Sequence, residues 1–128
     1  MDVFVPIDAS DASRRALEFA IQLADDYHGG LHVVHFSDTE TEAAQQVLAG
    51  ACETLGESPV DPELVLTDRF DVRAAAQVGK EALRLAKELG ADHIVLGHGQ
   101  LGTAETAILG SAAITIIRAS DLPVTVVS

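Results

Sequence analysis

Two features of the sequence have the residue types needed to bind a ligand. Asp8 directly follows the apolar run of residues 3–7, and a glycine-rich run extends from Gly97 to Ser111. Each feature also has a purely structural interpretation, because an aspartate can cap the helix that follows it and clustered glycines can form an ordinary loop. Which chemistry is open to them depends on the strands and helices that position them.

The other side chains that could do chemistry stand alone. His98 lies within the glycine-rich run, but the sequence offers no partner for it, so we expect a surface histidine. Cys52 is the single cysteine; it cannot form an internal disulfide and is expected to be a small packed or partly exposed helix residue. The remaining histidines, which lack metal-ligand spacing, are His28, His32, His35 and His93. The sequence therefore predicts no catalytic residue and no metal site.

Short apolar runs alternate with longer segments of helical period, which is the pattern of βαβ units and a parallel sheet. The expected strands are residues 3–7, 31–36, 64–66, 93–96 and 123–127. They predict one doubly wound α/β sheet of five parallel strands with helices on both faces, and ligand space at the carboxyl ends of the strands. At 128 residues, we expect residues 1–128 to form one domain.

Four helical segments are expected between these strands. Ser10 and Asp11 offer N-cap oxygens to the first segment, and Gly29 with Gly30 closes it. Gly79 weakens the middle of the third segment, which could therefore begin as late as Lys80. The second, third and fourth segments are residues 40–55, 71–89 and 112–117.

The charge of the chain excludes one class of partner. Twenty acidic residues oppose eight basic ones, giving a formal net charge of −12. Such a negative field repels phosphate backbones, so we expect no nucleic-acid partner. The acidity itself has two open explanations, an ordinary acidic protein or adaptation to a salty cytoplasm, in which a lysine-poor acidic surface stays hydrated.

The apolar pattern indicates the compartment. The chain does not begin with a basic stretch followed by an apolar run, and no apolar run approaches the ~20 residues that span a bilayer. A single cysteine suits a reducing environment. These observations predict a cytoplasmic protein without membrane association.

The sequence resembles the universal stress protein family along nearly its whole length. The matching segments are residues 5–10 (VPIDAS), 13–20 (SRRALEFA), 31–36 (LHVVHF), 90–97 (GADHIVLG) and 122–127 (LPVTVV). The resemblance implies the Rossmann-like fold of the adenine nucleotide alpha hydrolases, with strands in the order 3-2-1-4-5. It also implies a small regulatory binding module of the stress response rather than an enzyme.

The nucleotide-binding members of this family carry the signature G-x2-G-x9-G-[ST] after the fourth strand. Gly97 matches its first glycine, and Gly110 with Ser111 matches its closing pair, which we expect to open the last helix. There, backbone N–H groups would face a phosphate. Gln100 occupies the position of the second glycine, and Ala113 stands where the family often has a hydroxyl residue. Both departures weaken the prediction of phosphate binding.

The resemblance further implies a base and ribose site at the ends of the first two strands. Pro6, Ile7 and Asp8 would border the base and ribose, with the Asp8 carboxylate accepting hydrogen bonds. Phe36 would stack on the adenine or simply fill that space. The predicted ligand is ATP or another adenine nucleotide such as AMP, with or without Mg²⁺. The full set of predicted binding residues is Pro6, Ile7, Asp8, Ala9, Phe36, Leu96, Gly97, Gln100, Gly110, Ser111, Ala112 and Ala113.

Three functions are compatible with this sequence. The first is a regulatory protein that binds adenine nucleotide. The second, favoured by Gln100 and Ala113, is a family member that has lost nucleotide binding and acts through homodimerisation and protein partners. The resemblance implies that such a dimer forms through the last strand, in the region of Val124 and Val126. The third is slow ATP hydrolysis, which the lack of lysine and arginine between residues 97 and 111 disfavours.

Overall fold

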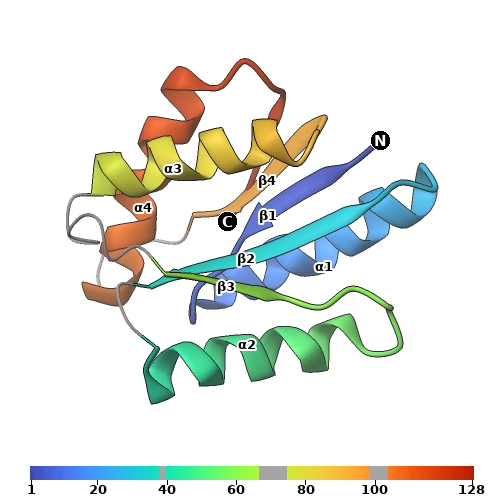
Figure 1. Ribbon diagram of the computed structural model, residues 1–128, viewed down its shortest axis with the longest axis horizontal. Helices are drawn as coiled ribbons and strands as arrows, with labels where there is room; N and C mark the ends of the chain where they lie inside the picture. The colour runs from blue at the N-terminus through green and yellow to red at the C-terminus, as the bar shows by residue number, and fades with distance from the viewer. Residues whose placement is uncertain (38–39, 67–74, 99–103) are drawn as a thin grey trace.

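The computed structural model describes residues 1–37, 40–66, 75–98 and 104–128, and for residues 75–76 and 104–111 it describes the backbone alone (Figure 1). Strands and helices alternate strictly along the chain, as the sequence predicts. The elements are β1 (Val3–Pro6), α1 (Asp11–Asp26), β2 (Leu31–Ser37), α2 (Glu42–Leu55), β3 (Glu63–Leu66), α3 (Ala75–Glu88), β4 (His93–Gly97), α4 (Ala104–Ala119) and β5 (Val124–Val127).

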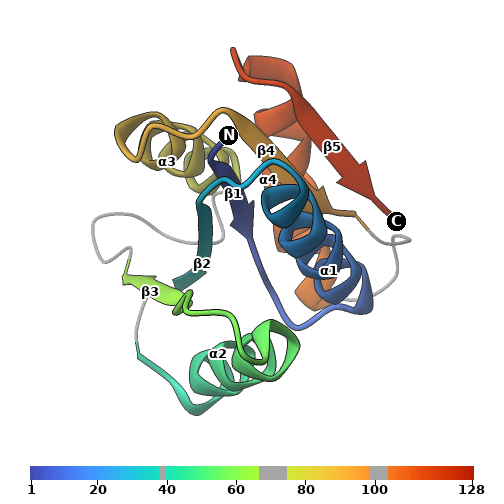
Figure 2. The same cartoon turned by 90° about the vertical axis from the view of Figure 1, so that its right-hand side faces the viewer.

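The five strands form one parallel sheet in the order β3-β2-β1-β4-β5, which confirms the predicted topology. Val3 of the central strand β1 pairs with Leu31 of β2 on one side and His93 of β4 on the other. The first half of the chain therefore adds strands on one side of β1, and the second half adds strands on the other side. The carboxyl ends of all five strands lie together, at what is here called the carboxyl edge of the sheet (Figure 2). This edge is where open α/β sheets bind ligands.

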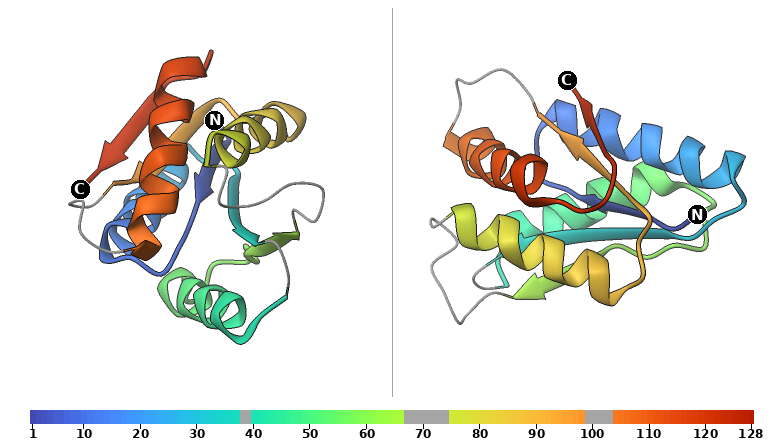
Figure 3. Two further views of the ribbon diagram at one scale, coloured as in Figure 1. Left: turned by 90° about the vertical axis from the view of Figure 1, so that its left-hand side faces the viewer. Right: turned by 90° about the horizontal axis from the view of Figure 1, so that it is seen from above.

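Helices cover both faces of the sheet. In Figures 1 and 3, α3 and α4 lie together on one face, while α1 and α2 lie on the other. The core under α1 and α2 contains Val3, Val5, Ile7, Ala16, Leu17, Ala20, Ala24, Val33, Ala51, Leu55 and Val95. The core under α3 and α4 contains Phe4, Val34, Phe36, Val78, Ala82, Ala86, Ala91, Ile94, Leu96, Ala112, Ala113 and Ile116.

In the sequence, the central strands are nearly continuous apolar runs, because helices bury them on both faces of the sheet. All four residues of β1 are buried, and Val3, Phe4 and Val5 have no exposed surface. Neither edge strand is buried in this way: every residue of β3 and β5 is at least partly exposed. Since β1 and β5 are parallel, the first residue lies at the amino ends of the strands and the last residue lies at their carboxyl ends (Figure 3). No helix in the described ranges is long and apolar enough to cross a lipid bilayer.

The end of α1 differs from the prediction. The helix stops at Asp26, and the left-handed residue that follows is His28, with φ of 54°, rather than Gly29 or Gly30. The Gly29 amide still donates to the Ala24 carbonyl at 2.8 Å, so the turn satisfies the free carbonyls of the helix end. The glycines thus mark the turn correctly without supplying its unusual backbone conformation.

The middle of α3 tolerates Gly79 for a packing reason. The helix begins at Ala75, between the two predicted starts, and passes through Gly79 without interruption. A Cβ atom on Gly79 would lie 2.7 Å from the Thr115 Cβ and 2.9 Å from the Ala112 carbonyl oxygen of α4. Glycine therefore lets α3 and α4 approach closely, at the cost of some helix propensity.

The last helix is longer than predicted. It begins at Ala104 rather than Ala112, because the apolar, alanine-rich segment from residue 104 onward favours a continuous helix despite Gly110. Gly110 and Ser111 therefore lie inside α4, and the expectation that they open the last helix is wrong.

Candidate ligand-binding site

A hydrogen-bond network among Asp8, Ser10 and Ser13 holds the loop between β1 and α1. Ser10 is the N-cap of α1, and its Oγ accepts a hydrogen bond from the Ser13 amide at 3.1 Å. The Asp8 Oδ1 accepts from both the amide and the hydroxyl of Ser10, at 2.8 and 2.6 Å. The buried Ser13 hydroxyl oxygen in turn accepts from the Asp8 amide at 2.8 Å. These bonds fix the Asp8 side chain relative to the end of β1.

Only one of the two carboxylate oxygens of Asp8 takes part in this hydrogen-bond network. Its Oδ1 organises the loop, while no residue in the described part of the chain donates to its Oδ2. The side chain is only partly buried. The structural and ligand-binding interpretations of Asp8 are therefore compatible, since one oxygen supports the loop and the other can accept a hydrogen bond from a ligand.

His35 joins the carboxyl ends of β1 and β2. Its Nδ1 lies 2.8 Å from the Ile7 carbonyl oxygen, and the Ile7 amide donates to the Val34 carbonyl at the same distance. A carbonyl only accepts, so the His35 Nδ1 carries the hydrogen of this bond. The two bonds together extend the contact between β1 and β2 to Ile7, the residue before Asp8.

A cavity of about 680 Å³ lies at the carboxyl ends of β1 and β2 and continues between α1 and α2. Its volume falls within the range of small-molecule sites, roughly 300–1,000 Å³. The lining residues from the β1–α1 segment are Pro6, Ile7, Asp8, Ala9, Ser10, Asp11, Ser13, Arg14 and Leu17. The others are His35, Phe36, Ser37, Thr41, Ala43, Ala44, Gln46, Val47, Gly50, Ala51, Glu53, Thr54 and Val78.

The wall of the cavity formed by α2 includes both small and larger side chains. Ala43 and Gly50 are seven residues apart, as are Ala44 and Ala51, so both pairs recur on one side of the helix. Ala44 and Ala51 are buried, whereas Ala43 and Gly50 are exposed at the cavity mouth. The polar groups of Asp8 and His35 lie at the end of this space that meets the sheet.

Acidic groups dominate the charge around the cavity. Asp8, Asp11 and Glu53 line it, against the single guanidinium of Arg14. Arg14 already donates to Glu18, one turn further along α1, at 2.7 Å, and both side chains are about half exposed. Among the described residues, no group of three His, Cys, Asp or Glu side chains could hold a metal ion.

The structure brings part of the predicted site together. Pro6, Ile7, Asp8, Ala9 and Phe36 all line the cavity. Leu96, Ala112 and Ala113 have no exposed surface, pack in the core under α3 and α4, and are not among the residues that line the cavity. Gln100 lies outside the described residues, as do Gly99 and Gly102 of the same glycine-rich run.

Gly97 has a packing role. A Cβ atom on this residue would lie 2.5 Å from the Ser13 amide nitrogen and 2.6 Å from the Ala12 carbonyl carbon and oxygen. The end of β4 therefore touches the first turn of α1, an approach that only glycine allows. This packing contact by itself explains why residue 97 is a glycine, with no need for a contact to phosphate.

Gly110 and Ser111 are placed differently from their predicted role. They lie in the second turn of α4 and beyond, where backbone amides already donate to carbonyls of the preceding turn. The free amides of this helix belong to its first turn, from Ala104. The closing pair of the sequence signature therefore does not supply a helix N-terminus for phosphate.

Several residues of the cavity were absent from the sequence prediction. Ser13 sits three residues after the N-cap Ser10, a spacing that places it in the first turn of α1 and could have indicated its role in the loop. His35 follows Val33 on the same face of β2, so its position beside α1 could be read from strand alternation. The lining residues of α2 carried a weaker signal, a recurrence of small residues that is also typical of ordinary packing.

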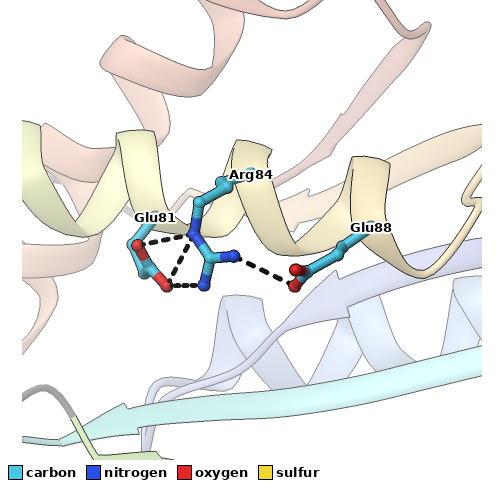
Figure 4. Close-up of polar contacts among 3 residues, drawn as sticks. All are labelled: Glu81, Arg84 and Glu88. Carbon is cyan, nitrogen blue, oxygen red and sulfur yellow. Dashed lines mark hydrogen bonds and ion pairs between the residues drawn. The ribbon is translucent and has the colours of Figure 1, made fainter.

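The remaining charged cluster lies on the surface of α3. Arg84 is bonded to Glu81 three residues before it and donates to Glu88 at 3.0 Å (Figure 4). Hydrogen bonding to Glu81 and the negative charges of both glutamates raise the pKa of Arg84 above its usual value. Lys80 and Lys87 are also exposed. This helix surface is solvated, as predicted, and contributes none of its charges to the cavity.

Comparison with known proteins identifies the family. The sequence profile described as the Universal stress protein family matches residues 1–128. The chain belongs to this family. The resemblance seen in the separate sequence segments is thereby confirmed over the whole chain, whereas no curated protein sequence matches it.

Solved structures of family members share the fold. A universal stress protein from Archaeoglobus fulgidus in complex with dAMP is 22% identical, with a TM-score of 0.73 over 100% of this chain and 98% of that one. A universal stress protein in complex with cAMP is 25% identical, with a TM-score of 0.74 over 99% and 95%. A family protein from Burkholderia pseudomallei is 26% identical, with a TM-score of 0.68 over 98% and 94%.

Proposed function

We propose that this protein is a regulatory binding module of the cytoplasmic stress response that binds an adenine nucleotide at the carboxyl edge of its sheet. The observation that carries the proposal is the cavity beside Asp8, whose Oδ2 lacks a partner among the described residues. A carboxylate in this position can accept from the hydroxyls of a ribose or the amine of an adenine.

The family relationship supports the class of ligand. One related protein was solved with dAMP and another, 25% identical to this chain, with cAMP. Both ligands combine an adenine base, a sugar and one phosphate. A cavity that combines polar groups at the strand ends with apolar side chains such as Leu17 and Ala44 suits the base and sugar of such a molecule.

The proposed role is binding without rapid turnover. The sequence from residue 97 to residue 111 contains no lysine or arginine that could neutralise charge developing on a transferred phosphate. The same samples used for binding therefore serve to measure ATP hydrolysis, for which we expect at most a slow rate, with or without Mg²⁺.

Calorimetric titration of the purified protein with AMP tests the proposal. We expect Asp8→Asn to weaken binding about tenfold or more, since it keeps the oxygen that organises the loop and replaces the free acceptor by a donor. Asp25→Asn on the exposed surface of α1 is the matched control, because it makes the same change in net charge. If wild-type protein binds no adenine compound at low or high salt, the proposal is wrong.

A second function is supported by the free edge of the sheet. Among the described strands β5 pairs only with β4, and its Val126 is 45% exposed. Ile114 and Ile117 of the neighbouring α4 are exposed to a similar extent. We therefore propose that two copies associate through β5, and that this association could act on protein partners even without nucleotide.

Light scattering across a range of protein concentrations tests this association. Val126→Glu places a charge on the β5 edge and should convert dimer to monomer. Leu66→Glu is the matched control, because Leu66 is also exposed but lies on β3, at the opposite edge of the sheet. A monomeric wild-type protein at every concentration, or equal effects of the two substitutions, would contradict the proposal.

A further inference from the structure

We infer that dissolved salt stabilises the folded state of this protein, because carboxylates gather at the end of the sheet where the helices terminate. That end, here called the amino edge, contains the amino ends of the strands and lies opposite the carboxyl edge. The inference makes the fold itself responsive to ionic strength. It concerns stability, so it does not depend on the proposed ligand or on the proposed dimer.

The connections that form the amino edge lie in the described part of the chain. They are the residues before β1 and the segments that lead into the other four strands, residues 27–30, 56–62, 89–92 and 120–123. Figure 1 shows the connections into β2, β3 and β4 at the same end of the molecule as the N-terminus. The ranges outside the described residues, 38–39, 67–74 and 99–103, instead follow β2, β3 and β4 in the chain. The charge of the amino edge can therefore be read from described residues.

Acidic side chains outnumber lysine and arginine in these connections and in the helix turns that precede them. Asp2 and Asp92 are held beside each other, since the Asp2 amide donates to the Asp92 Oδ2 at 2.9 Å and the Asp92 amide donates to the Asp2 carbonyl at 2.7 Å. The basic residues of this edge are Lys87 and Arg118. The acidic residues are Asp2, Asp25, Asp26, Glu53, Glu57, Asp61, Glu88, Asp92 and Asp121.

Few of these carboxylates meet a positive charge. Glu88 pairs with Arg84 at 3.0 Å, but Arg84 is shared with Glu81 of the same helix. Asp2 lies 3.8 Å from the His32 Nε2. The other carboxylates of the amino edge form no ion pair with a lysine or arginine among the described residues. The negative charge of this edge is thus largely uncompensated.

The helices add to this negative charge. The carbonyl end of a helix carries the equivalent of roughly half a negative charge, so an acidic residue in the last turn is unfavourable. Asp25 and Asp26 lie in the last turn of α1 and Glu53 lies in that of α2, and neither turn contains a basic residue. The first turns have the favourable arrangement, with Asp11 in α1 and Glu42 in α2. A carboxylate therefore has opposite effects at the two ends of one helix.

Salt weakens the repulsion between exposed charges, because the Debye length falls from about 10 Å at 0.1 M ionic strength to about 3 Å at 1 M. Folding brings carboxylates from distant connections to one end of a chain whose formal net charge is −12. Their repulsion is stronger in the folded state than in the unfolded chain, so screening favours folding. The exposed ion pairs of Arg14 and Arg84 also weaken in salt, but such pairs contribute little. The acidity of the chain is then an adaptation to salt.

Thermal denaturation in KCl, without nucleotide, tests the inference. We expect the melting temperature to rise by about 10 °C or more between about 0.02 and 1 M KCl, with most of the rise at the low end, where the Debye length changes most. Sucrose at the same concentrations is the uncharged control and should raise the melting temperature far less. A constant or falling melting temperature in KCl, or an equal rise in sucrose, would overturn the inference.

Two substitutions in α1 test the role of the amino edge. Asp25→Asn at the end of the helix and Asp11→Asn at its start remove the same charge from exposed positions. In about 0.02 M KCl, we expect Asp25→Asn to raise the melting temperature by about 2–4 °C and Asp11→Asn to lower it by a similar amount. Both shifts should shrink at about 1 M KCl. Shifts of the same sign, or no shift in Asp25→Asn, would show that placement at the amino edge has no effect and would overturn the inference.

Discussion

Gly97 and Ser13 are in backbone contact, so that a Cβ atom on residue 97 would lie only 2.5 Å from the amide nitrogen of Ser13. The contact joins the end of β4 to the first turn of α1, which carries the hydrogen bonds that hold Asp8. A glycine in the family signature thus supports the site through packing.

Gly97→Ala is therefore expected to destabilise the protein. The added methyl group would meet backbone atoms that cannot rotate away, and we expect a loss of about 1–3 kcal/mol in the free energy of unfolding. Denaturation with urea measures this loss. A variant as stable as the wild type would show that the α1–β4 contact can widen without cost.

Ser13→Ala tests the loop itself. The substitution removes the acceptor of the Asp8 amide in a part-buried position, and we expect it to cost about 1–2 kcal/mol. We also expect weaker AMP binding, since Asp8 would lose part of its support. Urea denaturation and calorimetry measure the two effects. Lower stability with unchanged affinity would show that the loop orients Asp8 without this bond.

Two glycine-to-alanine substitutions in helices should have opposite signs. At Gly50, where an added Cβ meets nothing within 4 Å, alanine should stabilise the protein by about 0.5–1 kcal/mol. At Gly79, the Cβ would meet α4 at 2.7 Å, and we expect a net loss of about 1–3 kcal/mol despite the better helix propensity. Thermal and urea denaturation compare the pair. Stabilisation at both positions would mean that α3 can move away from α4 without loss.

Reversing one charge on the cavity wall should change ligand preference. Glu53→Lys replaces a lining carboxylate by an amine, and we expect it to raise the affinity for ATP relative to AMP by about tenfold at low salt. Glu57→Lys makes the same change in net charge at an exposed residue outside the lining. Equal effects of the two variants would show that the overall charge, rather than the cavity, sets the preference.

The fold was predictable because burial on two faces leaves a strong pattern in the sequence. The run at β1 is continuously apolar, β4 is apolar after His93, and Ser10 marks the start of α1 as the predicted N-cap. The ends of helices were less predictable where neighbouring residues have opposing helix propensities. Gly110 suggested a helix start, but the surrounding alanine and isoleucine residues carry α4 through it from Ala104.

The candidate site was predictable only where it lies on a strand end. Pro6, Ile7, Asp8 and Phe36 occupy positions that the order of elements determines, and they line the cavity. The space between α1 and α2 depends on how two helices distant in sequence pack, so small residues such as Ala43 and Gly50 became informative only in the structure. The contact of Gly97 with Ser13 likewise joins residues 84 positions apart and leaves no local pattern.

The hydrogen-bond network around Asp8 also affects the thermodynamics of ligand binding. Because Ser10 and Ser13 already hold the carboxylate and the backbone of this loop, their rotational freedom is lost when the chain folds and not when a ligand arrives. A ligand therefore meets a pre-organised acceptor and loses less affinity to ordering than it would at a flexible loop. Association at this end of the cavity should require little rearrangement, so its rate should be set by encounter rather than by loop closure.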